Sequence, residues 1–269
     1  MKKYLVIGNP IEHSLSPQIH NHWIQKYNLL DSVYEKRKLE EKDLKNIINE
    51  MKEGKINGVN VTVPFKKTII PHLDELEPTA KKTGSVNTLI KKGDKIIGYN
   101  TDEPGFGLTL EEIFLKKNSA PKKIFILGAG GVTSSIICAL EKLKTKIFLS
   151  NRTKEKAKEL KNQYPEIEIL DWGKIPQTFD LVINTTSVGL KDNEKIDLDF
   201  NQSKGDNEKI FYDLIYNPKE TNFLKEARLR GNIVINGQKM FLNQAKIAFS
   251  LWTNIKPEID NNVIGLLDK

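Results

Sequence analysis

The chain has 269 residues, of which 38% are hydrophobic and 29% are charged. This length is enough for two modest domains with separate cores, and no apolar run approaches the ~20 residues of a membrane-spanning helix, so we expect no membrane association. The formal net charge of +7 raises the question of a nucleic-acid partner. However, the lysines alternate with glutamates and form no basic block, so we interpret them as a solvated surface without such a partner.

The single cysteine, Cys138, excludes an intrachain disulfide and favours a reducing compartment, which predicts a cytoplasmic protein. It lies in an apolar stretch, where we expect a buried small hydrophobe rather than a nucleophile. The first apolar run follows two lysines and is too short for the core of a secretory signal. We therefore interpret this run as a β-strand.

In the first hundred residues, apolar runs alternate with amphipathic segments. Helices are predicted at Pro17–Tyr27 and Glu41–Lys52, and Ser16, directly before a proline, is a suitable N-cap. This rhythm of strands and helices favours an α/β domain with a mostly parallel sheet. The predicted strands are Tyr4–Gly8, Val33–Lys38, Gly58–Val61, Thr88–Lys91 and Lys95–Tyr99.

A second series of strands and helices follows a domain boundary that we place around Asp102–Pro104. It again predicts an α/β domain with a mostly parallel sheet. The predicted strands are Lys123–Leu127, Lys146–Leu149, Glu168–Leu170, Leu181–Asn184, Ile210–Asp213 and Asn232–Ile235. The predicted helices are Gly105–Lys117, Gly131–Leu143, Lys154–Gln163, Lys219–Leu229 and Gln238–Trp252.

A glycine turn, Gly128-Ala129-Gly130-Gly131, joins an apolar strand to a helix in this second series. Gly128 permits a tight turn, while Gly130 and Gly131 let pyrophosphate oxygens approach the backbone at the N-terminus of a helix. Thr133 stands where such sites usually have a third small residue. A tight turn without a ligand is the alternative, but strand, turn and helix together favour a dinucleotide site.

The end of the next strand indicates which dinucleotide is bound. An NAD site usually has a carboxylate there for the ribose 2′-hydroxyl, whereas this chain has Asn151, Arg152 and Thr153. A guanidinium can pair with a 2′-phosphate, and Lys154 and Lys156 add positive charge, so we predict NADP(H). The fourth strand ends at small hydroxyl residues that begin with Thr185, which suits the same crevice.

Polar side chains that could hold a substrate follow several strands of the first series. Asn60 and Thr62 share one strand face and precede Lys66, while Asn87 and Asp102 lie at other strand ends. This set of amides, hydroxyls, one lysine and one aspartate suits a substrate with several hydroxyl groups. Histidines at 13, 20 and 22 lack a cysteine or carboxylate partner in a ligand pattern, so we predict no metal. The predicted N-cap role of Ser16 does not account for the nearby polar residues His13, Ser14, His20 and Asn21.

These motifs, in order along essentially the whole chain, resemble those of the shikimate dehydrogenase family. The matching segments are Gly8–Pro10, His13–Pro17, His20–Asn21, Asn60–Lys66, Gly84–Thr88, Asn100–Asp102 with Gly105, the glycine turn, Asn151–Thr153, Tyr212–Pro218, Gly237–Met240 and Gln244–Ala245. After Gly131 the chain departs from the family, because Val132–Ser135 replaces a run of small residues that often contains an arginine. This departure bears on the contacts to the pyrophosphate and not on the class of cofactor.

The resemblance implies an NADP-dependent enzyme that reversibly reduces 3-dehydroshikimate to shikimate, on the pathway through chorismate to aromatic amino acids. It implies an α/β substrate domain formed by residues 1–102 plus 237–269. It also implies a Rossmann-like NADP-binding domain at residues 103–236, with a cleft between the two. Lys66 and Asp102 would be the catalytic pair, with the protonated lysine stabilising charge on the carbonyl oxygen and supplying a proton.

The resemblance also assigns residues to the two ligands. The substrate would be held by Ser14, Ser16, Asn60, Thr62, Lys66, Asn87, Asp102, Tyr216 and Gln244. The predicted cofactor site comprises Gly128, Ala129, Gly130, Gly131, Asn151, Arg152, Thr153, Lys156, Thr185, Gly237 and Met240. The alternatives are a relative that also oxidises quinate or uses NAD, and a non-catalytic NADP-binding sensor, which would not need Lys66 and Asp102. We expect a monomer or a homodimer.

Overall fold

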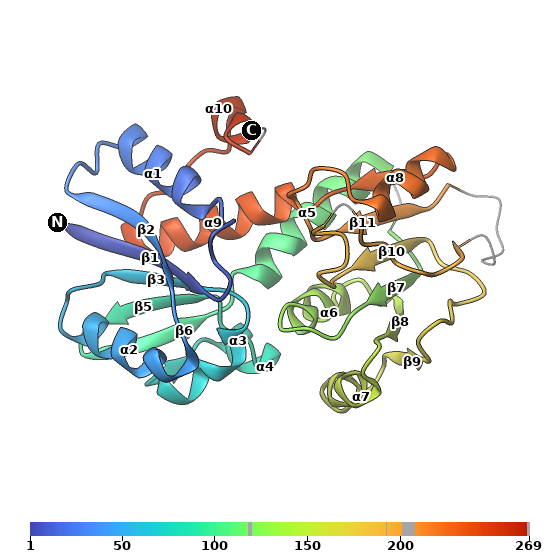
Figure 1. The fold of residues 1–269 in the computed structure, drawn as a ribbon, viewed down its shortest axis with the longest axis horizontal. Helices are drawn as coiled ribbons and strands as arrows, with labels where there is room; N and C mark the ends of the chain where they lie inside the picture. The colour runs from blue at the N-terminus through green and yellow to red at the C-terminus, as the bar shows by residue number, and fades with distance from the viewer. Residues whose placement is uncertain (118–119, 192, 201–207, 268–269) are drawn as a thin grey trace. The chain divides into compact units, whose positions relative to one another are not determined.

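A computed structural model describes residues 1–117, 120–191, 193–200 and 208–267 (Figure 1). The chain forms two compact units: Met1–Gly105 with Leu242–Lys269 is unit 1, and Phe106–Phe241 is unit 2. Each unit has a six-stranded sheet flanked by helices, which confirms the predicted α/β class. None of the described helices combines the length and the apolar character needed to cross a membrane.

The sheet of unit 1 is mostly parallel, with strand order β2-β1-β3-β5-β6-β4. β5 runs antiparallel to β3 and to β6, while β1 pairs parallel with β2 and β3, and β4 parallel with β6. β3 and β6 consequently run in the same direction and end at the same edge of the sheet. The strands are β1 (Lys2–Gly8), β2 (Ser32–Lys38), β3 (Gly58–Val61), β4 (Glu75–Leu76), β5 (Thr88–Lys92) and β6 (Lys95–Tyr99).

Helices cover both faces of this sheet (Figure 1). Because side chains alternate along a strand, Leu5 and Ile7 of β1 pack in the apolar core that contains α2, whereas Tyr4 stacks on Trp252 of α9. The helices of this unit are α1 (Ser16–Lys26), α2 (Leu44–Lys52), α3 (Phe65–Thr68), α4 (Pro78–Thr83) and α10 (Asn261–Gly265). Two longer helices, α5 (Asp102–Lys117) and α9 (Gln238–Thr253), belong partly to each unit.

Three local predictions for unit 1 are wrong. Ser16 is the first residue of α1 rather than its N-cap, because Leu15 already has a helical backbone; the Ser14 hydroxyl accepts from the Ser16 N–H at 3.4 Å. The segment predicted as one helix from Glu41 begins as a 3₁₀ turn, Glu41–Asp43. α5 begins at Asp102 instead of after Pro104, because the first turn of a helix tolerates a proline that lacks an N–H.

The sheet of unit 2 is entirely parallel, with strand order β12-β11-β10-β7-β8-β9. This is the doubly wound order, in which successive strands are added first on one side of β7 and then, from β10 on, on the other side. In this order a ligand crevice forms outside the carboxyl ends of the two central strands, β7 and β10. The strands are β7 (Lys123–Leu127), β8 (Lys146–Ser150), β9 (Glu168–Leu170), β10 (Leu181–Asn184), β11 (Ile210–Asp213) and β12 (Ile233–Ile235). The helices are α6 (Thr133–Glu141), α7 (Lys154–Gln163) and α8 (Asn222–Leu229).

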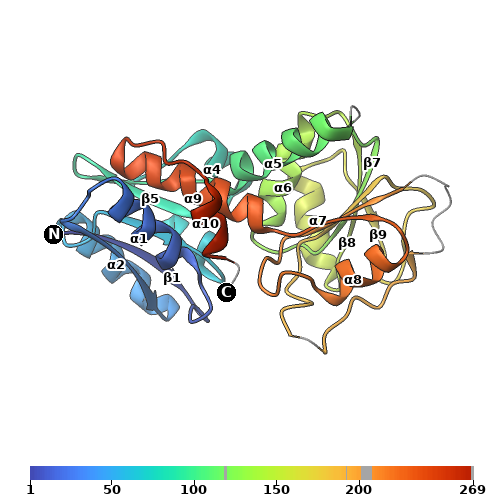
Figure 2. The ribbon, with the colours of Figure 1, turned by 90° about the horizontal axis from the view of Figure 1, so that it is seen from above.

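Two apolar layers enclose this second sheet. Ile124 and Ile126 of β7 face a layer that includes residues of α5, α6 and α7, while Phe125 and Leu127 face the layer of α8. Figure 2 shows α8 on the opposite side of the sheet from α6. Cys138 is only 6% exposed and lies in the first layer, as predicted for a small buried hydrophobe. The two layers fix the carboxyl ends of β7 and β10 side by side.

Candidate active site

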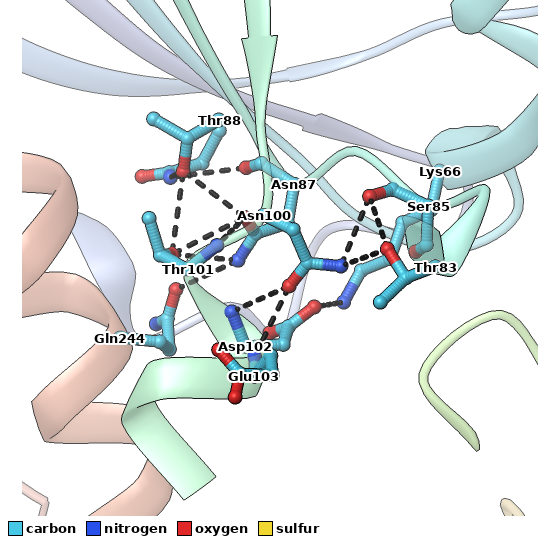
Figure 3. A network of polar contacts seen from close by, with 11 residues as sticks. Lys66, Thr83, Ser85, Asn87, Thr88, Asn100, Thr101, Asp102, Glu103 and Gln244 are labelled. Atoms are coloured by element: carbon cyan, nitrogen blue, oxygen red, sulfur yellow. Dashed lines mark hydrogen bonds and ion pairs between the residues drawn. The ribbon is translucent and has the colours of Figure 1, made fainter. Parts of the chain in front are cut away.

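A lysine–aspartate pair lies at one edge of the unit 1 sheet. Lys66, on α3 after β3, and Asp102, the first residue of α5 after β6, meet because β3 and β6 end at the same edge. The Lys66 Nζ is 2.6 Å from the Asp102 Oδ2, and the two side chains are 13% and 7% exposed (Figure 3). The pair thus combines a largely buried ammonium donor with a carboxylate that can orient it.

Asn100 fixes the position of Asp102. Its carboxamide oxygen accepts hydrogen bonds from the backbone N–H groups of Asp102 and Glu103, at 3.0 and 3.1 Å, and its Nδ2 donates to the Thr83 hydroxyl and the Ser85 carbonyl (Figure 3). Asn100 therefore secures the N-terminus of α5 in the manner of a capping side chain. The sequence did not indicate this role for Asn100, because the helix was expected to start later.

Asn87 contacts a second predicted substrate residue, Gln244, and is held by Thr101 in a buried network. Its Nδ2 donates to the Thr101 hydroxyl at 2.8 Å and to the Gln244 Oε1 at 3.4 Å, while its Oδ1 accepts from the Thr101 N–H at 2.7 Å (Figure 3). Gln244 lies on α9, which approaches α5 so closely that a Cβ on Gly105 would come within 2.8 Å of the Gln244 nitrogen. Because Gly105 has no side chain, Gln244 can approach and contact Asn87, which is 157 positions away in the chain.

Three other predicted substrate residues carry hydroxyl groups. Thr62 is half-buried directly after β3, and Ser14 and Ser16 lie at the start of α1. Over the ranges described, these hydroxyls make no hydrogen bond to Lys66 or Asp102. Asn60 is 7% exposed and bonded to Tyr34, Asn87 and Thr88.

The glycine turn lies at the switch point of the unit 2 sheet. Gly128 has φ +106°, and a Cβ there would lie 2.7 Å from the Thr185 hydroxyl oxygen, so only glycine fits. The Ala129 N–H donates to the Asn151 Oδ1 at 3.0 Å, and the Gly130 N–H donates to the Thr133 hydroxyl at 3.0 Å. A Cβ on Gly130 would meet no atom within 4 Å, which leaves the backbone open to a ligand.

Thr185 and Asn151 have bracing roles that the sequence did not indicate. The Thr185 hydroxyl donates to the Leu127 carbonyl at 2.8 Å and lies 2.9 Å from the Thr133 hydroxyl, linking the ends of β7 and β10 to α6. Asn151 ties the glycine turn to β8 and donates to the Thr153 carbonyl. These contacts hold the glycine turn in place.

The basic residues after β8 differ in their ion pairs. Arg152 and Lys156 are exposed, and within the described part of the chain neither has a carboxylate partner. Lys154 pairs with Asp171 at 2.7 Å, and this hydrogen bond raises the pKa of Lys154. The other arginines each have a glutamate partner: Glu50 for Arg37, Glu220 for Arg228 and Glu226 for Arg230. Arg152 is thus available for an anionic ligand.

Asp213, at the end of β11, anchors the loop after β10. It is fully buried and accepts hydrogen bonds from Asn184 Nδ2, the Ile215 N–H and the Thr221 hydroxyl. Asn184 in turn accepts from the N–H and hydroxyl of Thr186. Burial raises the pKa of Asp213 to about 6, although the three hydrogen bonds act in the opposite direction.

This raised pKa predicts a pH dependence of stability. The folded carboxyl binds its proton more tightly than the unfolded one, so the contribution of Asp213 to stability is greatest at low pH and is lost as the pH rises through about 6. We expect the free energy of unfolding of the wild type, relative to Asp213→Asn, to fall by about 2 kcal/mol between about pH 4.5 and about pH 7. Urea denaturation of both proteins at both pH values measures this change. An equal difference in the free energy of unfolding between wild type and Asp213→Asn at the two pH values would contradict the expectation.

Three further predicted residues lie in unit 2. Gly237, after β12, approaches Leu214 so closely that a Cβ would overlap the backbone carbonyl of that residue. Tyr216 stacks on Phe241, with ring centroids 4.3 Å apart. Met240 is 6% exposed and packs in the core beneath α6. Gly237 and Met240 thus make packing contacts within unit 2.

The close approach at Gly237 predicts a large effect of one methyl group. We expect Gly237→Ala to lower the free energy of unfolding by about 3 kcal/mol, because the overlapping carbonyl belongs to the backbone and cannot move freely. Gly107→Ala is the control, since a Cβ there meets nothing within 4 Å and lies in a helix, where alanine stabilises by ~0.5–1 kcal/mol. Equal urea midpoints for the two variants would refute the packing argument.

In the part of the chain that the structure describes, no three His, Cys, Asp or Glu residues are grouped so that they could hold a metal ion. The doubly wound sheet with its glycine turn has the architecture of a dinucleotide-binding unit. Unit 1 adds the Lys66–Asp102 pair among amides and hydroxyls. These features together define the chain as a dinucleotide-dependent oxidoreductase with separate cofactor and substrate units.

Comparisons with known proteins give the family. Residues 6–89 match the shikimate dehydrogenase substrate binding domain, and residues 110–222 match the shikimate / quinate 5-dehydrogenase family. The NADP(+)-dependent shikimate dehydrogenase of Pelagibacter ubique is 53% identical over 99% of this chain and 99% of its own. The chain belongs to the shikimate dehydrogenase family.

Solved structures agree with this assignment. The shikimate dehydrogenase of Aquifex aeolicus is 38% identical and superposes with a TM-score of 0.88, covering 100% of this chain and 98% of that one. The Thermus thermophilus enzyme, solved in complex with NADP(H) and shikimate, is 30% identical with a TM-score of 0.86, covering 100% of this chain and 99% of its own. Both the α/β class and the recognised family are therefore confirmed.

Proposed function

We propose that this chain reversibly reduces 3-dehydroshikimate to shikimate with NADPH, a step toward chorismate and the aromatic amino acids. The observation that carries the proposal is the ion pair between Lys66 and Asp102, 2.6 Å apart and largely buried. The relatives' shared activity supports the choice of substrate. Arg152, with no carboxylate partner among the residues described, supports NADP as the cofactor.

The pair can perform the proton transfer that the reduction requires. When bound, NADPH supplies the hydride that forms the new C–H bond at the carbonyl carbon. Lys66 stabilises the negative charge that develops on the carbonyl oxygen and donates a proton to it from Nζ. Asp102 holds the ammonium through its 2.6 Å contact. In the reverse direction Lys66 accepts the proton of the substrate hydroxyl.

Two groups of residues complete the proposed site. Ser14, Ser16 and Thr62, with the amides of Asn60, Asn87 and Gln244, would bind the carboxylate and ring hydroxyls of the substrate, and Tyr216 would lie nearby. The cofactor would contact the glycine turn through Gly128, Ala129, Gly130 and Gly131. Its 2′-phosphate would meet Asn151, Arg152, Thr153 and Lys156, and Thr185, Gly237 and Met240 would lie along the remainder. We further propose a cytoplasmic monomer or homodimer.

A four-way comparison of initial rates tests the proposal. Shikimate and quinate are each oxidised with NADP and with NAD, and we expect shikimate with NADP to give the highest kcat/KM. A comparable rate with quinate or NAD would instead favour an enzyme of relaxed specificity. NADPH binding without turnover of any pair would favour a non-catalytic sensor.

A further inference from the structure

Tyr34 lies behind the proposed substrate site, in the second strand of the unit 1 sheet. Its side chain is 2% exposed, and its hydroxyl is 2.7 Å from the Asn60 Oδ1. β2 is separated from β3 by β1, and Tyr34 is in register with Tyr4, which is itself in register with Gly58. The absence of a side chain on Gly58 leaves room above the sheet for Trp252, which a Cβ there would overlap.

The orientation of the Asn60 carboxamide follows from its partners. The Asn87 carbonyl oxygen can only accept, so the Asn60 Nδ2 must face it, at 3.2 Å, and the second Nδ2 hydrogen goes to the Thr88 hydroxyl at 3.0 Å. The Asn60 Oδ1 must then face Tyr34, whose hydroxyl donates to it. With both hydrogens used, Asn60 keeps one acceptor site on Oδ1 and no donor.

Two residues of α1 hold Tyr34 in place. The Asn21 side chain pairs with the Tyr34 backbone in both directions: its Oδ1 accepts from the Tyr34 N–H at 2.9 Å and its Nδ2 donates to the Tyr34 carbonyl at 2.8 Å. The His20 ring stacks on the Tyr34 ring, with centroids 4.2 Å apart and planes 3° apart. His20 and Asn21, for which the sequence indicated no role, thus both hold Tyr34 in position.

His20 acts on Tyr34 as an uncharged aromatic surface. It is 1% exposed, and over the described ranges neither ring nitrogen has a hydrogen-bond partner. Burial lowers the pKa of His20 to about 3, so the ring is neutral at physiological pH. Trp23, Phe249 and Trp252 surround it. This aromatic cluster restricts the Tyr34 ring to one position.

We infer that Tyr34 is a positioning residue for the substrate: held by His20 and Asn21, it fixes Asn60 so that Asn60 can only accept a hydrogen bond from a substrate hydroxyl. The inference rests on the proposed function. It assigns Asn60 to a ring hydroxyl and excludes it from binding the carboxylate, which offers no hydrogen to donate. It also gives the His20-Asn21 pair a role in substrate selection without contact to the substrate.

The first test compares Tyr34→Phe with Tyr4→Phe. Tyr34→Phe keeps the stacked ring and removes the hydroxyl, so we expect the KM for shikimate to rise about five- to ten-fold, kcat to change less than about two-fold and the KM for NADP to stay unchanged. Tyr4→Phe is the matched control, because Tyr4 is equally buried, in register with Tyr34, and stacks on Trp252. Its KM for shikimate should not change.

A second test identifies the substrate group. The KM values of wild type and Tyr34→Phe are compared on two shikimate analogues, each lacking one of the two ring hydroxyls that are not oxidised. With one of these analogues the two enzymes should have the same KM, which identifies the hydroxyl bound by Asn60. An analogue without the carboxylate should retain the five- to ten-fold difference in KM. An unchanged KM in Tyr34→Phe, with normal wild-type turnover, overturns the inference alone. The inference is also overturned if the KM difference between wild type and Tyr34→Phe disappears only with the analogue that lacks the carboxylate. A wild type that fails to oxidise shikimate overturns the proposed function and this inference together.

Discussion

Replacing Lys66 with alanine is expected to lower kcat by about a hundred- to ten-thousand-fold, the usual contribution of a positioned proton donor. The KM for shikimate should change only a few-fold, because the substrate keeps its amide and hydroxyl partners. The variant removes the ammonium that lies 2.6 Å from Asp102, so the developing alkoxide loses both its stabilising charge and its proton source. Steady-state oxidation of shikimate at saturating NADP measures both constants.

Lys67→Ala is the matched control for this variant. Lys67 is the next residue of α3 and is exposed, so its removal changes the net charge equally without reaching the ion pair. We expect kcat within about two-fold of wild type. If Lys66→Ala turned over at a near-normal rate, or if both variants lost activity equally, Lys66 would not be the proton donor.

Replacing Arg152 with alanine is expected to lower kcat/KM for NADP by about ten- to a hundred-fold, the range for losing a charge-assisted hydrogen bond. The kcat/KM for NAD, which has no 2′-phosphate, should stay within about two-fold. The residual preference for NADP should decrease again in Arg152→Ala with Lys156→Ala, because both side chains are exposed after β8 with no carboxylate partner among the described residues.

Arg228→Ala supplies the comparison for Arg152. Arg228 lies on α8 and is paired with Glu220, whose carboxylate raises its pKa. Its removal changes the same charge on the same unit, so a general electrostatic effect on cofactor binding would appear in both variants. If NADP and NAD were weakened equally in Arg152→Ala, the guanidinium would not be reading the 2′-phosphate.

The cofactor turn could be predicted from sequence because its determinants are local. An apolar strand, glycines and a helix follow one another within twenty residues, and the structure places Gly128 at the switch point with the positive φ that the turn requires. The absence of a carboxylate after β8 was equally visible. What the sequence could not show is that Asn151 and Thr185 hold the turn in place, because those hydrogen bonds join positions 22 and 58 residues apart along the chain.

The substrate side depends on contacts that no periodicity encodes. Asn87 and Gln244 meet across 157 residues because Gly105 lets two helices approach. Family resemblance, rather than residue pattern, brought Gln244 into the predicted set. The bond from Asn100 to the start of α5 had a sequence signal, an asparagine two residues before an acidic first turn. It was obscured by Pro104, which was interpreted as preceding a helix that begins at Gly105.

Catalysis of the proposed reduction is measured as the fall in NADPH absorbance when 3-dehydroshikimate is added to the purified protein, with the product identified by chromatography. We expect NADPH to be consumed in a one-to-one ratio with the shikimate formed, and we expect Lys66→Ala to bind NADPH normally but to consume it at least about a hundred-fold more slowly. NADPH binding by the wild type without any formation of shikimate would contradict the proposed activity.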